Sequence, residues 1–322
     1  MQTIKVNKKE AGQRIDKYIR KYLNNAPLSY IYKLFRKKDI KVNGKRIDIN
    51  YVIQENDEII IYINDQTLND FNVKKTISNT SNVLDIIYED ENILIINKDA
   101  GILVHEGEDN NKSNTLNNDV LYYLKSKGEY SENDLFTPSC VHRLDRNTSG
   151  LIVAAKTLES SKQLLELFKD KEVLKKEYIT LVVGNCKDKM TIDKPLLKDE
   201  KSKFVKVDKK GLTAITKYEK LISNDDYSLL KVNILTGRTH QIRVHMASIS
   251  HPILNDDKYG DFKANKEFSS KFKYKYQFLH SYKLTFKNID GVLSYLSNKE
   301  FIAPIKKEEE KIIQSIFPSY KL

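Results

Sequence analysis

The chain has 322 residues, of which 40% are hydrophobic and 31% charged, and its formal net charge is +11. These values exclude a wholly disordered chain and provide enough apolar residues for a large core. No apolar run reaches the ~18 residues of a membrane-spanning helix, so no membrane association is expected. The two cysteines, Cys140 and Cys186, are far apart, which argues against a disulfide scaffold or a cysteine-built zinc site. This use of cysteine suits a reducing cytoplasm, which is where we expect the protein, and the N-terminal residues lack the apolar core of a secretory signal.

Most of the excess positive charge lies at the N-terminus. Residues 1–50 hold 14 Lys and Arg against 4 Asp and Glu, whereas the rest of the chain is nearly neutral. A segment this basic attracts polyanions, because each Lys or Arg placed at a phosphate releases condensed counterions. The charge alone leaves two readings open: a surface that binds nucleic acid, or a solvated basic face without a partner.

The first elements follow from apolar spacing. The pattern predicts a helix over residues 15–23 and a second helix that begins at Pro27 and ends near Lys38. A short strand at residues 40–42 then meets Asn43-Gly44, a strong signal for a tight hairpin because both residues tolerate positive φ. A strand at residues 59–63 ends the unit.

This segment resembles the small RNA-binding module shared by a protein of the small ribosomal subunit and several RNA enzymes. The resemblance rests on Arg14-Ile15-Asp16-Lys17-Tyr18, on the helix that ends at Lys38 and on Val42-Asn43-Gly44-Lys45. It implies an α/β RNA-binding module over residues 1–63. The basic residues expected to contact RNA there are Lys33, Arg36, Lys37, Lys38, Lys45 and Arg46.

Residues 64–83 are polar and rich in Asn, Ser and Thr, without a sustained apolar period, so we expect a linker. From residue 84 the pattern predicts strands at 93–96, 178–183 and 230–234. It also predicts a helix capped by Thr157 or Ser160 and a short helix near Val120 within a polar excursion over residues 105–137. Because there is no regular βαβ rhythm, we expect residues 84–322 to form an α+β domain on an antiparallel or mixed sheet.

Three segments of this larger part carry candidate site residues, and each has a structural alternative. Asp145 lies between Arg143 and Arg146, whose charges stabilise a carboxylate and attract phosphates, although a surface ion pair is the commoner role for such an aspartate. Tyr178 begins a strand, where a core or edge aromatic is the alternative. Arg243 lies off the apolar face of a helix, where the alternative is a surface cation.

The three segments are residues 142–150 (His-Arg-Leu-Asp-Arg-Asn-Thr-Ser-Gly), 175–178 (Lys-Lys-Glu-Tyr) and 236–245 (Thr-Gly-Arg-Thr-His-Gln-Ile-Arg-Val-His). Their content and order resemble the RluA-type RNA pseudouridine synthases, and among these the RluC-like enzymes of large-subunit ribosomal RNA. The resemblance spans nearly the whole chain. It implies an isomerase that detaches uracil from ribose, turns it and rejoins it through carbon, without a cofactor or a metal. The implied partner is RNA, most simply 23S ribosomal RNA.

The resemblance also implies roles for individual residues. Asp145 corresponds to the essential carboxylate, Arg243 to its guanidinium partner and Tyr178 to the ring that packs on the target base. The target uridine must leave its stack, which costs on the order of a few kcal/mol. Arg143 is expected to fill the vacated stack, and Arg146 and Arg238 to support phosphates or loops.

Two departures from the family pattern concern the backbone, because Ser250 and Asn255 stand where glycines are usual. Asparagine tolerates left-handed backbone angles better than most residues, whereas serine at such a position is harder to explain.

Three alternatives for the function stay open. The same chemistry on transfer RNA is one, and a non-catalytic RNA-binding factor of ribosome assembly is another. A metal-dependent hydrolase that uses His240 and His245 is the third, although their spacing of five residues suits one helix face poorly. No coiled-coil or dimer stripe is evident, so we expect a monomer.

Overall fold

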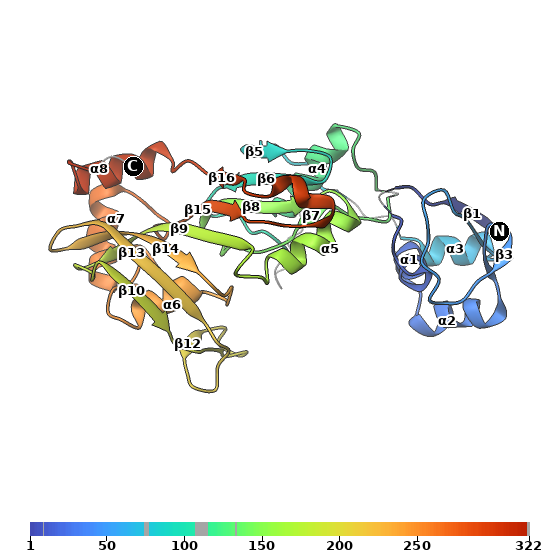
Figure 1. Ribbon diagram of the computed structural model, residues 1–322, viewed down its shortest axis with the longest axis horizontal. Helices are drawn as coiled ribbons and strands as arrows, with labels where there is room; N and C mark the ends of the chain where they lie inside the picture. The colour runs from blue at the N-terminus through green and yellow to red at the C-terminus, as the bar shows by residue number, and fades with distance from the viewer. Residues whose placement is uncertain (9, 74–76, 107–114, 133, 321–322) are drawn as a thin grey trace.

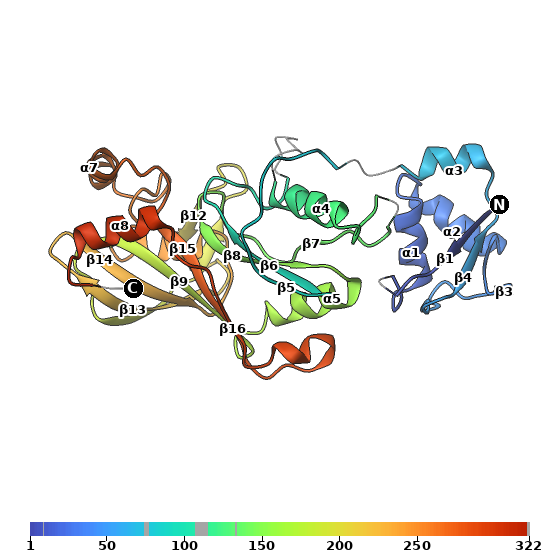
Figure 2. The same ribbon diagram turned by 90° about the horizontal axis from the view of Figure 1, so that it is seen from above.

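The structure is a computed structural model that describes residues 1–8, 10–73, 77–106, 115–132 and 134–320. Figures 1 and 2 show a small N-terminal part, residues 1–73, beside one end of a longer part that begins at residue 77. The smaller part contains β1 (Gln2–Lys5), α1 (Ile15–Tyr22), α2 (Leu28–Lys37), β2 (Ile40–Val42), β3 (Lys45–Arg46), β4 (Glu58–Ile61) and α3 (Asp65–Phe71).

The smaller part folds as its apolar spacing predicts. Ile15, Tyr18 and Ile19 of α1 are buried, and with Ile31 and Leu34 of α2 they pack on a four-stranded antiparallel sheet of order β1-β4-β2-β3. The turn between β2 and β3 is the expected tight hairpin, since Asn43 and Gly44 have φ of 51° and 73°. The basic residues of α2 and of this hairpin remain exposed.

The prediction of a linker is wrong for residues 65–71, which form α3. The side chain of Asn64 caps this helix by accepting a hydrogen bond from the Thr67 amide at 2.7 Å. Leu68 and Phe71 then pack against the core of the smaller part, and the Phe71 ring contacts Tyr30. Two apolar residues at a spacing of three are too few to predict a helix, but they suffice when a preformed core lies beside them.

The smaller part also contacts the larger one directly. The buried carboxylate of Glu10 accepts a hydrogen bond from the Leu135 amide at 3.0 Å, and Leu135 packs against the core of the smaller part. Lys162 donates a hydrogen bond to the carbonyl of Gly12 at 2.9 Å. These contacts fix where the basic face of the smaller part lies relative to the rest of the chain.

The larger part consists of many strands and a few helices. Its elements are β5 (Ile86–Glu89), β6 (Ile93–Lys98), α4 (Leu116–Ser126), β7 (Ser139–Cys140), β8 (Ser149–Ala155), α5 (Leu158–Leu167), β9 (Leu174–Val183), β10 (Lys189–Asp193), β11 (Leu196–Lys198), β12 (Val205–Val207), β13 (Ile215–Ser223), β14 (Tyr227–Ile234), α6 (Gln241–Ala247), α7 (Phe262–Phe272), β15 (Leu279–Phe286), the 3₁₀ helix η2 (Gly291–Leu296), β16 (Glu300–Ile302) and α8 (Lys307–Ile316). Among the described residues, no helix is both long and apolar enough to cross a bilayer.

One large sheet organises this part, in the order β10-β13-β14-β9-β15-β8-β6-β5, with β16 beside β15 and β7 beside β8. Among the paired strands of the described residues, only β8 and β15 run parallel. Gly150 permits this pairing: its φ is 104°, and a Cβ there would lie 2.2 Å from the carbonyl oxygen of Ser281 on β15. The predicted α+β class with a mixed sheet is confirmed.

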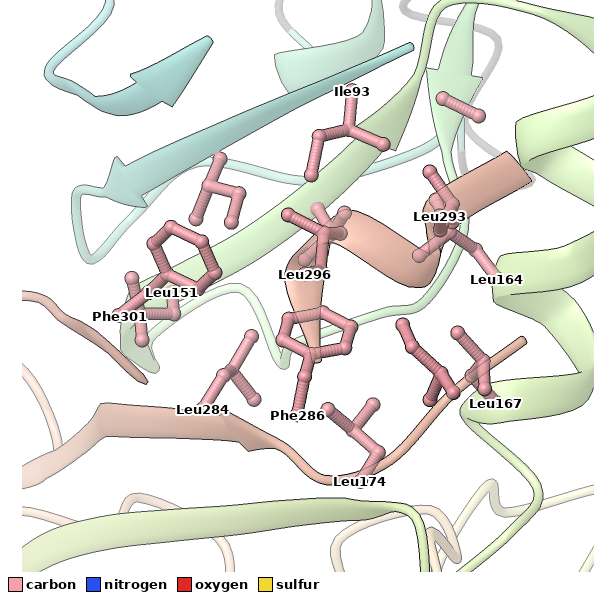
Figure 3. Packing of buried hydrophobic residues seen from close by; sticks show 14 of the residues in the cluster. Ile93, Leu151, Leu164, Leu167, Leu174, Leu284, Phe286, Leu293, Leu296 and Phe301 are labelled. Atoms are coloured by element: carbon pink, nitrogen blue, oxygen red, sulfur yellow. The ribbon is translucent and has the colours of Figure 1, made fainter. Parts of the chain in front are cut away.

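Helices cover both faces of the sheet, which explains the unbroken apolar runs of its inner strands. Ile93 and Ile95 of β6 pack toward α5 and η2, where Leu164 and Leu293 lie, whereas the alternate residues of β6 pack toward α4 (Figures 2 and 3). The predicted cap of α5 is present, because Thr157 and Ser160 form a reciprocal capping box.

In the other half of the sheet, α6 covers the face that α5 covers in the first half. Tyr178 and Val182 of β9 pack toward Ile242 and Met246 of α6, while α7 and α8 cover the opposite face. The cores under α5 and α6 are separate, and the loop over residues 141–147, which connects β7 to β8, lies between them. The cavity described below occupies this gap.

Candidate active site

Asp145 lies in the loop that precedes β8, and the backbone of this loop is held from two sides. The Thr148 amide donates to the Asp145 carbonyl at 3.1 Å. The buried ammonium of Lys98 donates to the carbonyls of Asp99, Ile102 and Arg146 at 2.8, 2.9 and 3.0 Å. Burial lowers the pKa of Lys98 to about 7, and the nearby charges of Asp99 and Asp145 oppose this shift. Lys98 therefore ties the end of β6 to the residue that follows Asp145.

The side chain of Asp145 forms an ion pair with Arg243 of α6, although 98 positions separate them. The Arg243 Nη1 donates to Asp145 Oδ2 at 2.9 Å. The other edge of the guanidinium binds Asp256 bidentately, with Nε and Nη2 each 2.7 Å from a carboxylate oxygen, and Nη2 also lies 3.2 Å from the exposed carboxylate of Asp257. Asp256 therefore holds the guanidinium so that Nη1 faces Asp145.

The pKa shifts of Arg243 and Asp256 keep both side chains charged. Burial acts to lower the pKa of Arg243, but hydrogen bonds and charge from Asp256, and then Asp145, raise it overall. Burial acts to raise the pKa of Asp256, but Arg243 brings it below the ordinary value. The sequence alternative for Arg243, a surface cation on its helix, is wrong because the side chain is buried and faces the cavity.

Tyr178 is 8% exposed, and its ring belongs to the core under α6. Burial, with a smaller contribution from the charge of Asp145, raises the pKa of Tyr178 to about 12, although a hydrogen bond with Ser281 opposes the shift. The phenol therefore keeps its proton at neutral pH. Its visible role is an aromatic wall beside Asp145.

His240 adds a neutral group next to the ion pair. It has a left-handed backbone, with φ of 53°, and its Nδ1 lies 2.8 Å from the hydroxyl of Tyr259. Its Nε2 is 3.9 Å from Asp145 Oδ1, which is too long for a hydrogen bond. Burial lowers the pKa of His240, with Arg243 and Lys258 adding to the shift and Asp145 opposing it. Among the described residues, no hydrogen bond is made to Asp145 Oδ1, and Asp145 lines the cavity described next.

The cavity has a volume of about 740 Å³, within the range that holds a ligand of nucleotide size. It brings together six of the residues singled out in the larger part, Asp145, Tyr178, Arg243, Arg143, Arg146 and Arg238. Arg143 and Arg146 are exposed at its rim, and Arg238 donates to the Thr213 carbonyl at 3.0 Å. The candidate RNA contacts Lys33, Arg36, Lys37, Lys38, Lys45 and Arg46 lie apart from it, on the surface of the smaller part.

The two histidines of the metal alternative lie in different surroundings. His245 is buried, with its ring nitrogens 2.8 Å from Thr216 Oγ1 and 2.9 Å from the Lys194 carbonyl, whereas His240 faces Tyr259. Within the described ranges, no group of three His, Cys, Asp or Glu side chains is arranged to hold a metal.

Sequence reasoning missed Asp256 and did not assign a role to Lys98. An acidic pair at 256–257 precedes Tyr259-Gly260, but no spacing rule joins a loop carboxylate to an arginine 13 positions earlier. The tertiary fold alone brings them together.

Comparison with known proteins finds relatives along nearly the whole chain. The RNA pseudouridylate synthase family matches residues 92–248. The chain is 31% identical to ribosomal large subunit pseudouridine synthase C of Vibrio vulnificus, over 98% of this chain and 96% of the relative. It is 34% identical to ribosomal large subunit pseudouridine synthase D of Buchnera aphidicola, over 84% and 85% of the two chains.

Among solved structures, human RNA pseudouridylate synthase domain containing 4 matches with a TM-score of 0.57 and 22% identity. The match covers 72% of this chain and 92% of the human chain. At this identity the similarity concerns the fold, and it agrees with the mixed sheet described above.

Proposed function

The chain belongs to the RNA pseudouridine synthase family, whose members are isomerases, and we propose that it converts uridines of large-subunit ribosomal RNA into pseudouridine with Asp145 as the essential carboxylate. The observation that carries this proposal is the convergence of Asp145, Arg243 and Tyr178 on one cavity with arginines at its rim. A carboxylate, a fixed cation and an aromatic wall suit a base that is detached, turned and rejoined in one place.

The reaction needs no net oxidation or hydrolysis. The bond between N1 of uracil and C1′ of ribose breaks, a bond between C5 and C1′ forms, the proton on C5 leaves, and N1 takes up a proton. Asp145 Oδ2 is held by Arg243, so Oδ1 is the atom that attacks, whether at the ribose or at the base. Because Arg243 is buried and bound to Asp256, its charge stays beside Asp145 when RNA excludes water from the cavity.

The uridine reaches this cavity by leaving its stack in the RNA. Tyr178 packs on the everted base, as an aromatic face suits any base plane. Arg143 is exposed at the cavity rim, where it takes the place of the base in the stack, and Arg146 and Arg238 bind neighbouring phosphates or support the loops.

We assign residues 1–63, together with α3 that packs on their core, to an RNA-binding module and residues 84–322 to the catalytic domain. The exposed basic residues of α2 and the β2–β3 hairpin support RNA binding by the module, because they face solvent, where a phosphate backbone can reach them. We also assign the protein to the cytoplasm as a monomer; both cysteines are free and buried, as in a reducing compartment.

The test of the function is a map of pseudouridines in total RNA from cells with and without the gene, with complementation by the wild-type gene and by Asp145→Asn. The proposal expects specific sites in large-subunit ribosomal RNA to disappear and to return only with the wild-type gene. If pseudouridines disappear from transfer RNA instead, the protein performs the same reaction on transfer RNA. An unchanged map in all RNAs would overturn the enzymatic function.

A further inference from the structure

Lys176 is a buried cation without a carboxylate partner in the described structure. Its side chain is among the buried charged groups, with 7% of the residue exposed. Its ammonium has one hydrogen-bond acceptor among the described residues, the carbonyl of Phe168 at 3.3 Å. Burial lowers the pKa of Lys176, and the charge of Asp170 opposes this shift only in part. A buried ammonium can donate three hydrogen bonds, so two remain unused.

The position of Lys176 on β9 directs it into the active-site cavity. Residues two apart on a strand share a face, so Lys176 lies on the same side of the sheet as Tyr178. Its neighbours across β15 include Leu284, and Leu284, Lys176 and Tyr178 all line the cavity. The adjacent Lys175 points to the opposite face, where it pairs with Glu177 at 2.9 Å.

Lys176 lies in the part of the cavity that Phe168 lines. A second, smaller pocket shares Asp145, Tyr178 and Arg243 with the cavity but is lined without Lys176 or Phe168, so only the larger cavity extends from these three residues to Lys176 and Phe168. The remaining part is bounded by the C-terminal end of α5, where the exposed Leu165 and Lys169 lie.

An aromatic floor accompanies the ammonium there. The ring of Phe168 lies 6.0 Å from Lys176 Nζ, and its other neighbour is the ring of His142, stacked at 4.2 Å between centroids and 21° between planes. Burial lowers the pKa of His142 to about 3, so this ring is neutral. The end of the cavity thus combines a cation with a flat apolar surface.

We propose that Lys176 binds the backbone phosphate of a nucleotide next to the target uridine, at a second subsite of the cavity whose floor is Phe168. This inference rests on the proposed function, because it takes RNA as the substrate. The RNA supplies the anion that the described residues do not, and the phosphate accepts the two unused hydrogen bonds. Fixing this neighbour holds the everted uridine in register with Asp145.

A purely structural role for Lys176 predicts a different outcome. If the ammonium served the fold, its removal would destabilise the protein. A buried charge with one carbonyl partner is instead unfavourable for folding, and an apolar side chain of similar length stabilises such a position or leaves it unchanged. Lys176→Met therefore separates the two roles by the sign of its effect on stability.

The experiment compares wild type, Lys176→Met and the matched control Lys175→Met, which removes the neighbouring charge on the opposite face of β9. Each protein is assayed on unmodified large-subunit ribosomal RNA made by transcription, with tritium release from C5 of uracil as the readout for turnover. Affinity is measured by filter binding at several salt concentrations, and stability by urea unfolding. A synthetic hairpin around the modified uridine is then prepared with single neutral methylphosphonate links flanking it.

The proposal expects Lys176→Met to weaken RNA binding by about 10-fold or more, as loss of a charged hydrogen bond does, while stability is equal or higher. Lys175→Met leaves affinity nearly unchanged. One methylphosphonate position weakens binding by wild type and Lys175→Met but not by Lys176→Met. The inference would be overturned if the two variants bound RNA equally well, or if all three proteins responded equally to every methylphosphonate. Turnover by the wild type would still support the proposed function in that case.

If the wild-type protein does not turn over ribosomal RNA, the choice of substrate is tested before the role of Lys176. The comparison is then repeated on transfer RNA transcripts, and turnover there corrects the substrate while the Lys176 test proceeds as before. Absence of turnover on both RNAs would overturn the proposed function, and with it the phosphate subsite.

Discussion

The two parts of the molecule hold their positive charge in opposite ways. In the smaller part, Lys33, Arg36 and Lys37 stand in solvent on α2, whereas in the larger part Lys98 and Arg243 are buried and bound on several sides. Exposed charges interact weakly and are screened by salt, while buried charges fix geometry. The contrast predicts that changes to the exposed charges of the smaller part alter affinity for RNA, and that changes to Lys98, Arg243 and the groups bound to them alter turnover or folding.

The largest effect is expected at Asp145. Asp145→Asn keeps the shape of the side chain but removes the charge, so turnover should fall by about 10⁴-fold or more, as it does when a reacting group is lost. RNA affinity should change little, because the phosphate contacts lie elsewhere. Tritium release under single-turnover conditions and filter binding check both statements. Turnover near the wild-type rate would remove Asp145 from its role.

A smaller loss is expected at Asp256, which touches Arg243 but not the cavity. Asp256→Asn leaves the buried guanidinium with less counter-charge, so turnover should fall by about 100-fold and the free energy of unfolding by about 3 kcal/mol. Asp257→Asn is the matched control, because Asp257 also binds Arg243 but is exposed. If both variants behave alike in unfolding and turnover assays, burial is not what makes Asp256 important.

The buried ammonium of Lys98 is expected to make the free energy of unfolding depend on pH. Its pKa falls from 10.5 to about 7 on folding, so between these pH values the unfolded chain binds more protons, and the free energy of unfolding rises with pH. Lys98→Met should lose this increment and, because three carbonyls lose their donor, should also turn over more slowly. Urea unfolding at pH 6.5 and 8.5 measures the difference, and equal pH dependence of the two proteins would contradict it.

The exposed charges of α2 should affect affinity alone. The triple variant Lys33→Gln, Arg36→Gln, Lys37→Gln should lower the slope of log affinity against log salt by about 2, as expected for three lost phosphate contacts on single-stranded RNA. Its turnover at saturating RNA should be that of wild type. The control places the same charge change on α7, at Lys263, Lys266 and Lys271, which are also exposed. Equal salt slopes for both triple variants would show that the smaller part does not grip RNA specifically.

The smallest effect is expected from a neutral backbone change. Ser250 is exposed and has φ of 65°, so Ser250→Gly should raise the free energy of unfolding by about 1 kcal/mol without a change in turnover. Asn255 also has positive φ, but its side chain bonds to Tyr274 and Ser269, so Asn255→Gly should destabilise the protein. Urea unfolding compares the two variants. If both are stabilised, backbone strain alone decides the outcome, and the hydrogen bonds of the Asn255 side chain contribute little.

Local patterns predicted much of the fold because local chemistry decides it. Asn43-Gly44 specifies a hairpin turn, Thr157 a helix start and the apolar run at residues 93–96 a buried strand. The helix at residues 65–71 was missed because its stability comes from the core beside it, not from its own apolar period. Such tertiary stabilisation is not visible in a short window of sequence.

The candidate site residues also fall into two groups, those that the sequence indicates and those that only the tertiary structure reveals. Motif resemblance pointed to Asp145, Tyr178 and Arg243, but the residues themselves left surface and core alternatives open. Asp256 had no signal, because its importance comes from a contact made across the fold. That Lys176 has no carboxylate partner among the described residues is also a property of the tertiary structure, and no pattern in residues 175–178 indicates it.

The parallel pairing of β8 with β15 has a consequence for folding. β8 and β15 pair across more than a hundred intervening residues, which include the strand of Tyr178 and the helix of Arg243. Such a closure is entropically slow, so it should follow the formation of the local hairpins. In refolding from urea, circular dichroism should recover first and tritium release later, because the two halves that supply Asp145 and Arg243 meet only in the final step.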